Sequence, residues 1–162
     1  MSKNLKQLGN KETKYNYNQP DKNILETFNN KAGSLVVPFI CNEFTSICPV
    51  TGQPDFAKFE ILYIPNKQCI ESKSLKLYLG SFRNHGEFHE EVTHRIMKDI
   101  FSIIKPRFIR VFGDFNVRGG ISIKPLALRF ATNLPASENK EIKLKIENYD
   151  RLRHWDFGIV SI

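Results

Sequence analysis

Two side chains in one short stretch of the sequence could carry out covalent and acid–base chemistry. Cys48 is followed by Pro49 and lies seven residues before Asp55. A catalytic cysteine must be accessible and must ionise to a thiolate, and a loop position permits both. Asp55 would then act as a proton donor beside the thiolate. The alternatives are that Cys48 is a small buried hydrophobic residue and that Asp55 caps a turn.

A second group of polar side chains stands where two helices are predicted to begin. Residues 75–82 and 88–103 carry apolar side chains at the spacing typical of amphipathic helices, and residues 84–86 interrupt the pattern. Backbone N–H groups and the helix dipole favour bound anions and polar ligands at helix starts. The alternative is a pair of amphipathic helices whose charges are simply solvated. The polar residues concerned are Glu71, Ser72, Lys73, Lys76, His89 and Glu90.

Other common kinds of site find little support. Cys41 and Cys69 lie next to apolar residues of predicted strands, which favours small buried side chains. The cysteines and histidines show neither C-x-x-C nor H-E-x-x-H spacing, so no metal site is predicted. The nine glycines form no G-x-G-x-x-G or Walker motif. Any nucleotide would therefore bind without the usual phosphate loop.

Composition limits the partner and the compartment. The net charge of +7 points to an anionic partner, such as a nucleic acid, a phosphorylated cofactor or a nucleotide. Three cysteines form no even disulfide set, which favours a reducing cytoplasm. We expect neither a signal peptide nor a membrane span, because no apolar run approaches the required length.

The order of predicted elements indicates an α+β fold around an antiparallel sheet. We expect residues 1–30 to form a polar, loosely ordered arm and residues 31–162 to form one domain with a charged tail. Strands are predicted at 35–40, with an irregularity at Pro38, and at 59–64, 68–70, 108–115 and 121–124. Residues 41–54 are predicted to form a loop, and the two helices end near Lys105. Alternating apolar residues at 142–146 suggest an additional edge strand.

Four motifs in order resemble one enzyme family. They are S-I-C-P-V-T-G-Q-P-D at 46–55, E-S-K-S-L-K-L-Y at 71–78, F-H-E at 88–90 and R-G-G-I-S-I at 118–123. Together they resemble the NADPH-dependent 7-cyano-7-deazaguanine reductases of queuosine biosynthesis, the QueF family. The resemblance covers residues 35 to 125, and the length is similar to that of the single-module type.

The resemblance implies a tunnelling fold, in which an antiparallel sheet with two helices on one face oligomerises into a barrel. It also implies reduction of a nitrile to a primary amine, which consumes two NADPH and needs no metal. Further expectations are a homo-oligomer of pentameric rings that can pair into a decamer, no direct nucleic-acid contact, no membrane contact and a cytoplasmic location.

Roles carry over to the residues that match the motifs. Cys48 matches the nucleophile that forms a covalent thioimide, and Asp55 matches the acid that protonates the nitrile nitrogen. Glu90 matches the carboxylate that binds the guanine-like edge, and His89 its neighbour near the reacting carbon. The segment that holds the other side of the base corresponds to Ile70, Glu71 and Ser72. Lys73, Lys76 and Arg118 are the expected phosphate contacts for NADPH.

Two other functions remain open from the sequence. One is a related enzyme of the same architecture, such as a pterin-forming cyclohydrolase, which also binds its base with a glutamate but uses zinc. The other is a basic nucleic-acid-binding module, which would bind RNA in a salt-dependent way and would not need Cys48.

Overall fold

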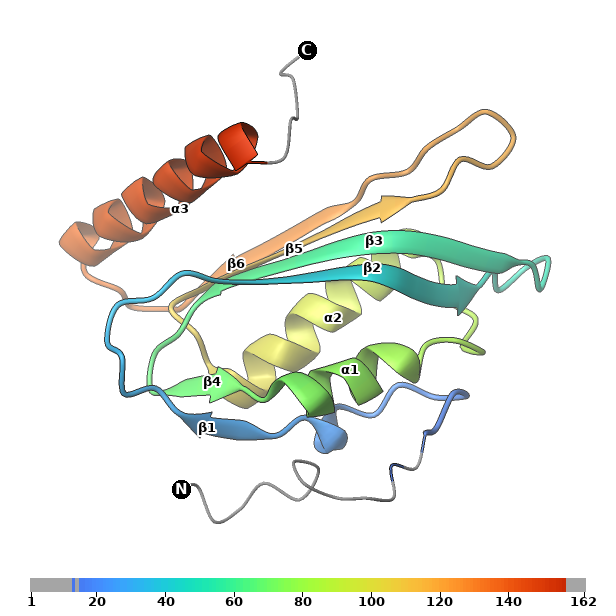
Figure 1. Cartoon of the computed structure of the whole chain (residues 1–162), viewed down its shortest axis with the longest axis horizontal. Coiled ribbons are helices and arrows are strands. Elements are labelled where there is room, and N and C mark those ends of the chain that lie inside the picture. Colours follow the sequence, from blue (N-terminus) through green and yellow to red (C-terminus); the bar gives the residue numbers. More distant parts are fainter. Residues whose placement is uncertain (1–12, 14, 157–162) are drawn as a thin grey trace.

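An antiparallel four-stranded sheet forms the centre of the protein (Figure 1). The computed structural model describes residue 13 and residues 15–156, with side chains up to residue 153. The sheet has the order β2 (Val37–Ile47), β3 (Pro54–Ile64), β5 (Phe108–Phe115) and β6 (Leu126–Phe130). A smaller sheet pairs β1 (Thr27–Asn29) with β4 (Gln68–Ile70). The helices are η1 (Lys22–Ile24), α1 (Ser72–Gly80), α2 (His89–Ile104) and α3 (Ala136–Asp156).

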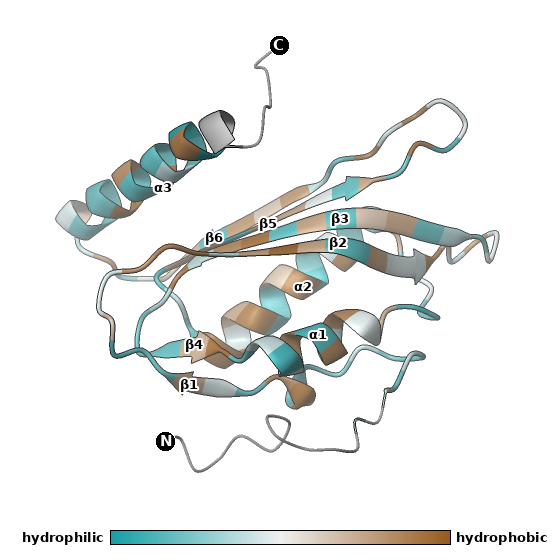
Figure 2. Cartoon of the chain, viewed as in Figure 1, coloured by the Kyte–Doolittle hydropathy of each residue, from teal (hydrophilic) through white to brown (hydrophobic). Residues whose placement is uncertain are grey.

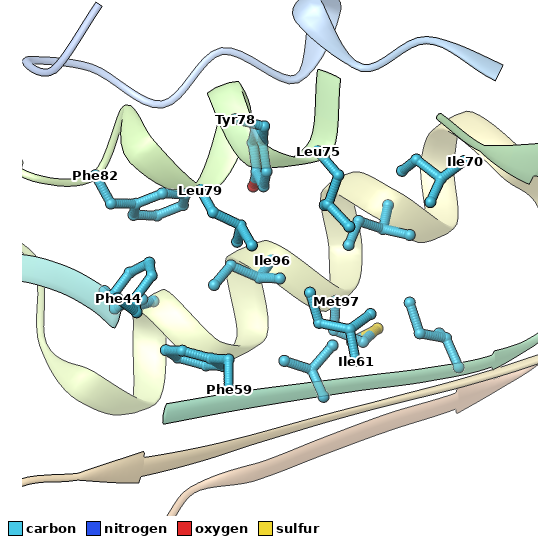
Figure 3. Packing of buried hydrophobic residues seen from close by; sticks show 14 of the residues in the cluster. Phe44, Phe59, Ile61, Ile70, Leu75, Tyr78, Leu79, Phe82, Ile96 and Met97 are labelled. Atoms are coloured by element: carbon cyan, nitrogen blue, oxygen red, sulfur yellow. The ribbon is translucent and has the colours of Figure 1, made fainter. Parts of the chain in front are cut away.

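Helices α1 and α2 cover one face of the sheet and bury the main core. The predicted apolar stripe is confirmed, because Leu75, Tyr78 and Leu79 of α1 are buried and so is Phe82, which follows the helix. Figure 3 shows these side chains pointing from α1 toward Ile96 and Met97 of α2 and toward Phe59 and Ile61 of β3. Since each large buried side chain contributes about 1.5–3 kcal/mol, this interface holds the helices firmly on the sheet.

The start and the end of α2 follow from its local sequence. Glu90 and Glu91 stand in the first turn, where carboxylates interact favourably with the helix dipole. The helix ends at Lys105, whose φ of 44° is left-handed, and Pro106 cannot continue it. The predicted stripe is confirmed in the middle of the helix, but Phe88 precedes the helix and is half exposed.

Helix α3 lies against one end of the opposite face of the sheet, so the prediction of an edge strand at 142–146 is wrong (Figure 1). Ile142 is buried against a second apolar cluster, which contains Leu62, Ile64 and Phe108. Leu144 is exposed. Figure 2 shows hydrophilic and hydrophobic bands alternating along α3. The strand-like alternation of these residues therefore belongs to a helix with one narrow apolar side.

Charged side chains also join α3 to the sheet. Glu60 of β3 is 3 % exposed and accepts a hydrogen bond of 2.9 Å from Arg110 of β5. Arg110 also binds Asp150 of α3 at 2.8 Å, and Arg153 pairs with Glu60. This network lies between the sheet and α3.

Two strand predictions need correction. Residues 41–47 are not a loop, because β2 continues to Ile47 with a bulge between Cys41 and Phe44, and the irregularity is there and not at Pro38. The long partner strand β3 keeps these residues paired in spite of their turn-prone sequence. The predicted return strand at 121–124 is also displaced, since β6 runs over 126–130.

The N-terminal arm is more ordered than predicted over residues 22–29. Leu25 joins the core, and β1 pairs with β4, which does not pair with β3. The Glu71 N–H donates to Glu26 O (2.8 Å), and the Glu26 N–H donates to Ser74 Oγ (2.9 Å). The arm therefore supports the start of α1. Residues 1–12 and 14 lie outside the described residues, and the domain boundary stays a prediction.

Candidate active site

Cys48 lies in a tight turn at the end of β2, as predicted. Its N–H donates to Gln53 O (2.9 Å), and its carbonyl accepts from the Gly52 N–H (3.0 Å). Gly52 has a φ of +69°, a conformation that favours glycine. The turn leaves the Cys48 side chain half-buried, so the thiol is accessible.

The turn activates the thiol. Hydrogen bonds from the Thr51 side chain and from the N–H groups of Thr51 and Val50 lower the pKa of Cys48 from 9.0 to about 7, and Arg118 adds to this effect. A large fraction is therefore thiolate at neutral pH, which is the nucleophilic form. The other two cysteines differ, because burial raises the pKa of both Cys41 and Cys69.

Asp55 lies at the start of β3 and is only 2 % exposed. Its Oδ1 accepts a hydrogen bond of 2.6 Å from Arg118, and its Oδ2 lies 3.1 Å from His89 Nε2. That second oxygen has no well-directed hydrogen bond, and neither has Ser46 Oγ, which belongs to the residue paired with Asp55 on β2. Buried polar atoms normally have hydrogen-bond partners, so these two atoms single out this position in the fold.

Arg118 connects Asp55 to the cysteine turn. Besides Asp55, its guanidinium donates to Gln53 Oε1 (2.5 Å) and to Thr51 Oγ1 (3.4 Å) and hydrogen-bonds to Cys48. The register of β3 with β5 pairs Ala57 with Phe115, which carries the residues after β5 toward Asp55. The structure thus places Arg118 beside both Cys48 and Asp55. Its role toward NADPH stays a prediction.

His89, the first residue of α2, completes this cluster. Its ring stacks on Phe115 with centroids 3.9 Å apart and planes 14° from parallel, which fixes its orientation toward Asp55. Glu90 follows in the first helical turn and is exposed. The predicted residues Cys48, Asp55 and His89 therefore come together in one chain, with Arg118 added.

The other predicted substrate-binding residues lie elsewhere. Ile70, Glu71 and Ser72 line a cavity of about 930 Å³ together with β1 and the segment that leads into β2. They lie at the start of α1, whereas the segment that contacts the cysteine turn follows α1, so about 13 Å of helix separates the two groups (Figure 1). Both carboxylate oxygens of Glu71 accept from the N–H groups of Lys73 (2.8 Å) and Ser74 (2.7 Å). One chain alone does not bring this segment to Cys48.

The two predicted lysines are on α1. Lys76 is exposed and lines a cavity of about 420 Å³ with Tyr15, Tyr17 and Arg83, and Lys73 is half-buried. Among the described residues, no three His, Cys, Asp or Glu side chains gather as metal ligands would. In the same part of the chain, none of the helices has the length and apolarity to cross a membrane.

Four residues of the cluster were not predicted as site residues: Ser46, Thr51, Gln53 and Phe115. Three of them belong to the same sequence motif as Cys48 and Asp55, which could have pointed to them. Phe115 carried no such indication, because its place depends on strand register.

Comparisons with known proteins decide the family. The NADPH-dependent 7-cyano-7-deazaguanine reductase of Streptococcus mutans is 54% identical over 125 residues, which is 76% of this chain and 76% of that protein. The enzyme of the same name from Neisseria meningitidis serogroup B is 54% identical over 122 residues, covering 74% and 77%. A sequence model of the QueF family, described as QueF-like protein, matches residues 54–133. The chain belongs to the QueF family.

The fold of this QueF-family protein agrees with a solved structure. The apo crystal structure of the archaeosine synthase QueF-Like aligns with a TM-score of 0.55 at 19% identity, covering 62% of this chain and 96% of that one. The expected α+β tunnelling fold of the single chain, an antiparallel sheet with two helices on one face, is thus confirmed, and so is the family resemblance of the motifs. Its assembly into a barrel stays a prediction.

Proposed function

We propose that this protein reduces the nitrile of 7-cyano-7-deazaguanine to the primary amine with NADPH. The observation that carries the proposal is the lowered pKa of Cys48 in a cluster with Arg118, Asp55 and His89. Family membership supports the same reaction, because the 54% identical relatives carry the name of this activity.

The first step is the addition of the Cys48 thiolate to the nitrile carbon. A C–S bond forms, one C–N π bond breaks, and its electron pair goes to the nitrogen, which receives a proton from Asp55. The product is a neutral thioimide. Its carbon accepts hydride more readily than a nitrile carbon does, which is the general advantage of covalent catalysis. Asp55 Oδ2 suits this transfer, because it is buried and has no well-directed hydrogen bond.

NADPH supplies two hydrides, one from each of two molecules. Between the two reductions the C–S bond breaks, and Cys48 leaves again as a thiolate, which its neighbours Arg118 and Thr51 stabilise. One nitrile, two NADPH and two protons thus give one amine and two NADP⁺. Lys76 fits a role in holding the cofactor, since it is exposed and lines a cavity with Arg83. Lys73 and Arg118 complete the proposed phosphate contacts.

Recognition of the base is assigned to Glu90, with Ile70, Glu71 and Ser72 on the opposite side. A carboxylate accepts two adjacent N–H donors of a deazaguanine with charge-assisted hydrogen bonds. Glu90 is exposed at the start of α2, directly after His89, which suits this role.

We further propose that the active site is completed by a neighbouring copy in a homo-oligomer built on pentameric rings, which can pair into a decamer. Strands β2 and β6 are edge strands among the described residues, and Ile40, Leu126 and Leu128 expose apolar side chains there. Such edges need a partner. A neighbour's segment 70–72 would supply what one chain leaves about 13 Å away. We place the reaction in queuosine biosynthesis in the cytoplasm, and the three free cysteines fit a reducing compartment.

The test is to incubate the protein with 7-cyano-7-deazaguanine and NADPH and to follow the loss of nicotinamide absorbance. We expect two NADPH consumed per nitrile. Cys48→Ala should abolish turnover, whereas Cys41→Ala and Cys69→Ala serve as matched thiol controls and should keep most of it. Without NADPH, mass spectrometry should find the substrate adduct on Cys48 alone. No turnover, or an active Cys48→Ala variant, would contradict the proposal.

A further inference from the structure

The segment His85–Glu87 contacts both sequence neighbours of Cys48. The Ile47 N–H donates to His85 O (3.0 Å), and the Glu87 N–H donates to Ile47 O (3.2 Å). On the other side, a Cβ atom added to Gly86 would lie 3.4 Å from Pro49 Cα. The cysteine is thus flanked by one short segment, which fixes the residue before it and packs on the residue after it.

The same segment leads directly into the other half of the catalytic cluster. After Glu87, only Phe88 precedes His89, whose Nε2 lies 3.1 Å from Asp55 Oδ2. A shift of the segment would therefore move the thiol and the imidazole together, although Cys48 and His89 lie 41 positions apart in the chain.

The side chain of Glu87 anchors this segment to the body of α2. It is 10 % exposed and accepts three hydrogen bonds of 2.7–2.9 Å from Arg95. His85 Nε2 lies 3.3 Å from its Oε2. Arg95 in turn interacts with Asp99 and Tyr78, and the Tyr78 hydroxyl donates to Asp99 (2.7 Å) inside the interface of α1 and α2. The anchor reaches the core of the domain.

We propose that Glu87 and Arg95 are positioning residues for catalysis by Cys48, acting through the segment His85–Glu87. Neither is needed to touch the substrate. A bidentate arginine–carboxylate pair is rigid as well as strong, so it suits a role in fixing geometry. The proposal rests on the function proposed above. Its first readout, the reactivity of Cys48, does not require nitrile reduction.

The cysteine turn is sensitive to such a shift. The hydrogen bonds that activate Cys48 come from the turn 48–52, whose start is held by Ile47 and whose side is packed by Gly86. Hydrogen-bond strength falls steeply with misalignment. Loss of the anchor should therefore weaken the stabilisation of the thiolate without removing any group that bonds to it.

The test is the rate of alkylation of Cys48 by iodoacetamide as a function of pH, read by peptide mass mapping. For Arg95→Met we expect the midpoint to rise by about one pH unit from its value near 7, and the rate at pH 7 to fall about fivefold. The kcat for nitrile reduction should fall, with KM for NADPH little changed. Arg95→Lys keeps the charge but not the bidentate geometry, so it should rescue only part.

Arg107→Met is the matched control, because it breaks the Arg107–Glu138 ion pair (3.1 Å) far from the cysteine turn. It should leave the alkylation profile unchanged. If Arg95→Met lowers only the melting temperature and keeps the wild-type midpoint, the pair is merely structural and the proposal is wrong. Should Arg95→Met fail to fold, the alkylation midpoint of Cys48 is measured in Arg95→Lys and Glu87→Gln instead. A raised midpoint supports the proposal, and a wild-type midpoint in both variants contradicts it. A shifted midpoint in a protein that reduces no nitrile would keep the positioning role and reject the proposed reaction.

Discussion

Two polar clusters of the protein differ in what their side chains bond to. Around the cysteine turn, the side chains bond to one another, as in the contacts of Arg118 with Asp55 and Gln53. At the start of α1, Glu71 bonds to the N–H groups of its own helix, and Ser74 bonds to the backbone of Glu71. The first cluster joins side chains from distant parts of one chain, whereas the second holds a helix start beside an open cavity.

This difference separates reactivity from binding. The groups that set the pKa of Cys48 all lie in the same chain, so the isolated fold should already present a reactive thiol. The segment around Glu71 lies away from Cys48 of its own chain, so under our proposal it meets substrate only when a neighbouring chain brings its cysteine turn there. We therefore expect substitutions in the cluster around the cysteine turn to change kcat. Substitutions in the cluster at the start of α1 should change KM or the dependence of activity on assembly.

We expect the largest effect from substitution of Asp55, and substitution of Glu90 should change a different kinetic constant. Asp55→Asn removes the proposed acid and should lower kcat by about 10²-fold or more while substrate binding persists. Glu90→Gln replaces an acceptor of two N–H donors with a group that carries its own donors, so KM for the nitrile should rise instead. Steady-state kinetics of both variants measure this, and interchanged effects would contradict the assigned roles.

Removal of Arg118 should have a smaller effect that depends on pH. The wild-type pKa of Cys48 is lowered to about 7, so its thiolate and its alkylation rate increase as the pH rises through 7. In Arg118→Met this midpoint should rise by only a fraction of a unit, because Arg118 makes the smallest of the contributions that lower the pKa and the hydrogen bonds from Thr51 and Val50 remain. The control is Lys124→Met, which breaks a surface ion pair with Asp114 and leaves Arg118 in place. It should not move the midpoint of Cys48 alkylation.

The smallest effect concerns the shared pocket. Ser72→Trp should block the cavity at the exposed start of α1 without disturbing the cysteine turn. Mixed by co-refolding with Cys48→Ala, it should regain about a quarter of wild-type activity, because random assembly gives that share of interfaces both intact halves. Native mass spectrometry confirms the mixing. No recovery in verified mixed oligomers would place the whole pocket in one chain.

Sequence patterns predicted the elements whose partners are local. The stripe around Tyr78 was correct, and so was the part of the predicted loop that holds Cys48, residues 48–53, because helical periodicity and turn residues act over a few positions. The motif that contains Asp55 is also local, and the family that it indicated is confirmed. Long-range pairing was not accessible in this way. Arg118 reaches Asp55, 63 positions away, only through the register of β3 and β5.

The C-terminal helix shows a different limit. Ile142, Leu144 and Ile146 alternate as in a strand, yet Ile142, Ile146 and Tyr149 also recur at helical spacing and are the ones that pack on the sheet. Three apolar residues cannot distinguish the two periods, and the distribution of charges along the helix hides its narrow apolar side. The partner surface, formed by Leu62 and Phe108 on the back of the sheet, decides the outcome.

The charged contacts between α3 and the sheet limit how far the chain can be truncated from its C-terminal side without loss of stability. Glu60 is 3 % exposed, and its carboxylate pairs with Arg110 of β5 and with Arg153 of α3. A chain shortened before α3 would expose Leu62 and Ile64 to solvent and would leave Arg110 alone to pair with the buried Glu60, and both changes destabilise the fold. Miniaturisation would therefore require redesign of the back of the sheet, with Glu60 replaced in the same step.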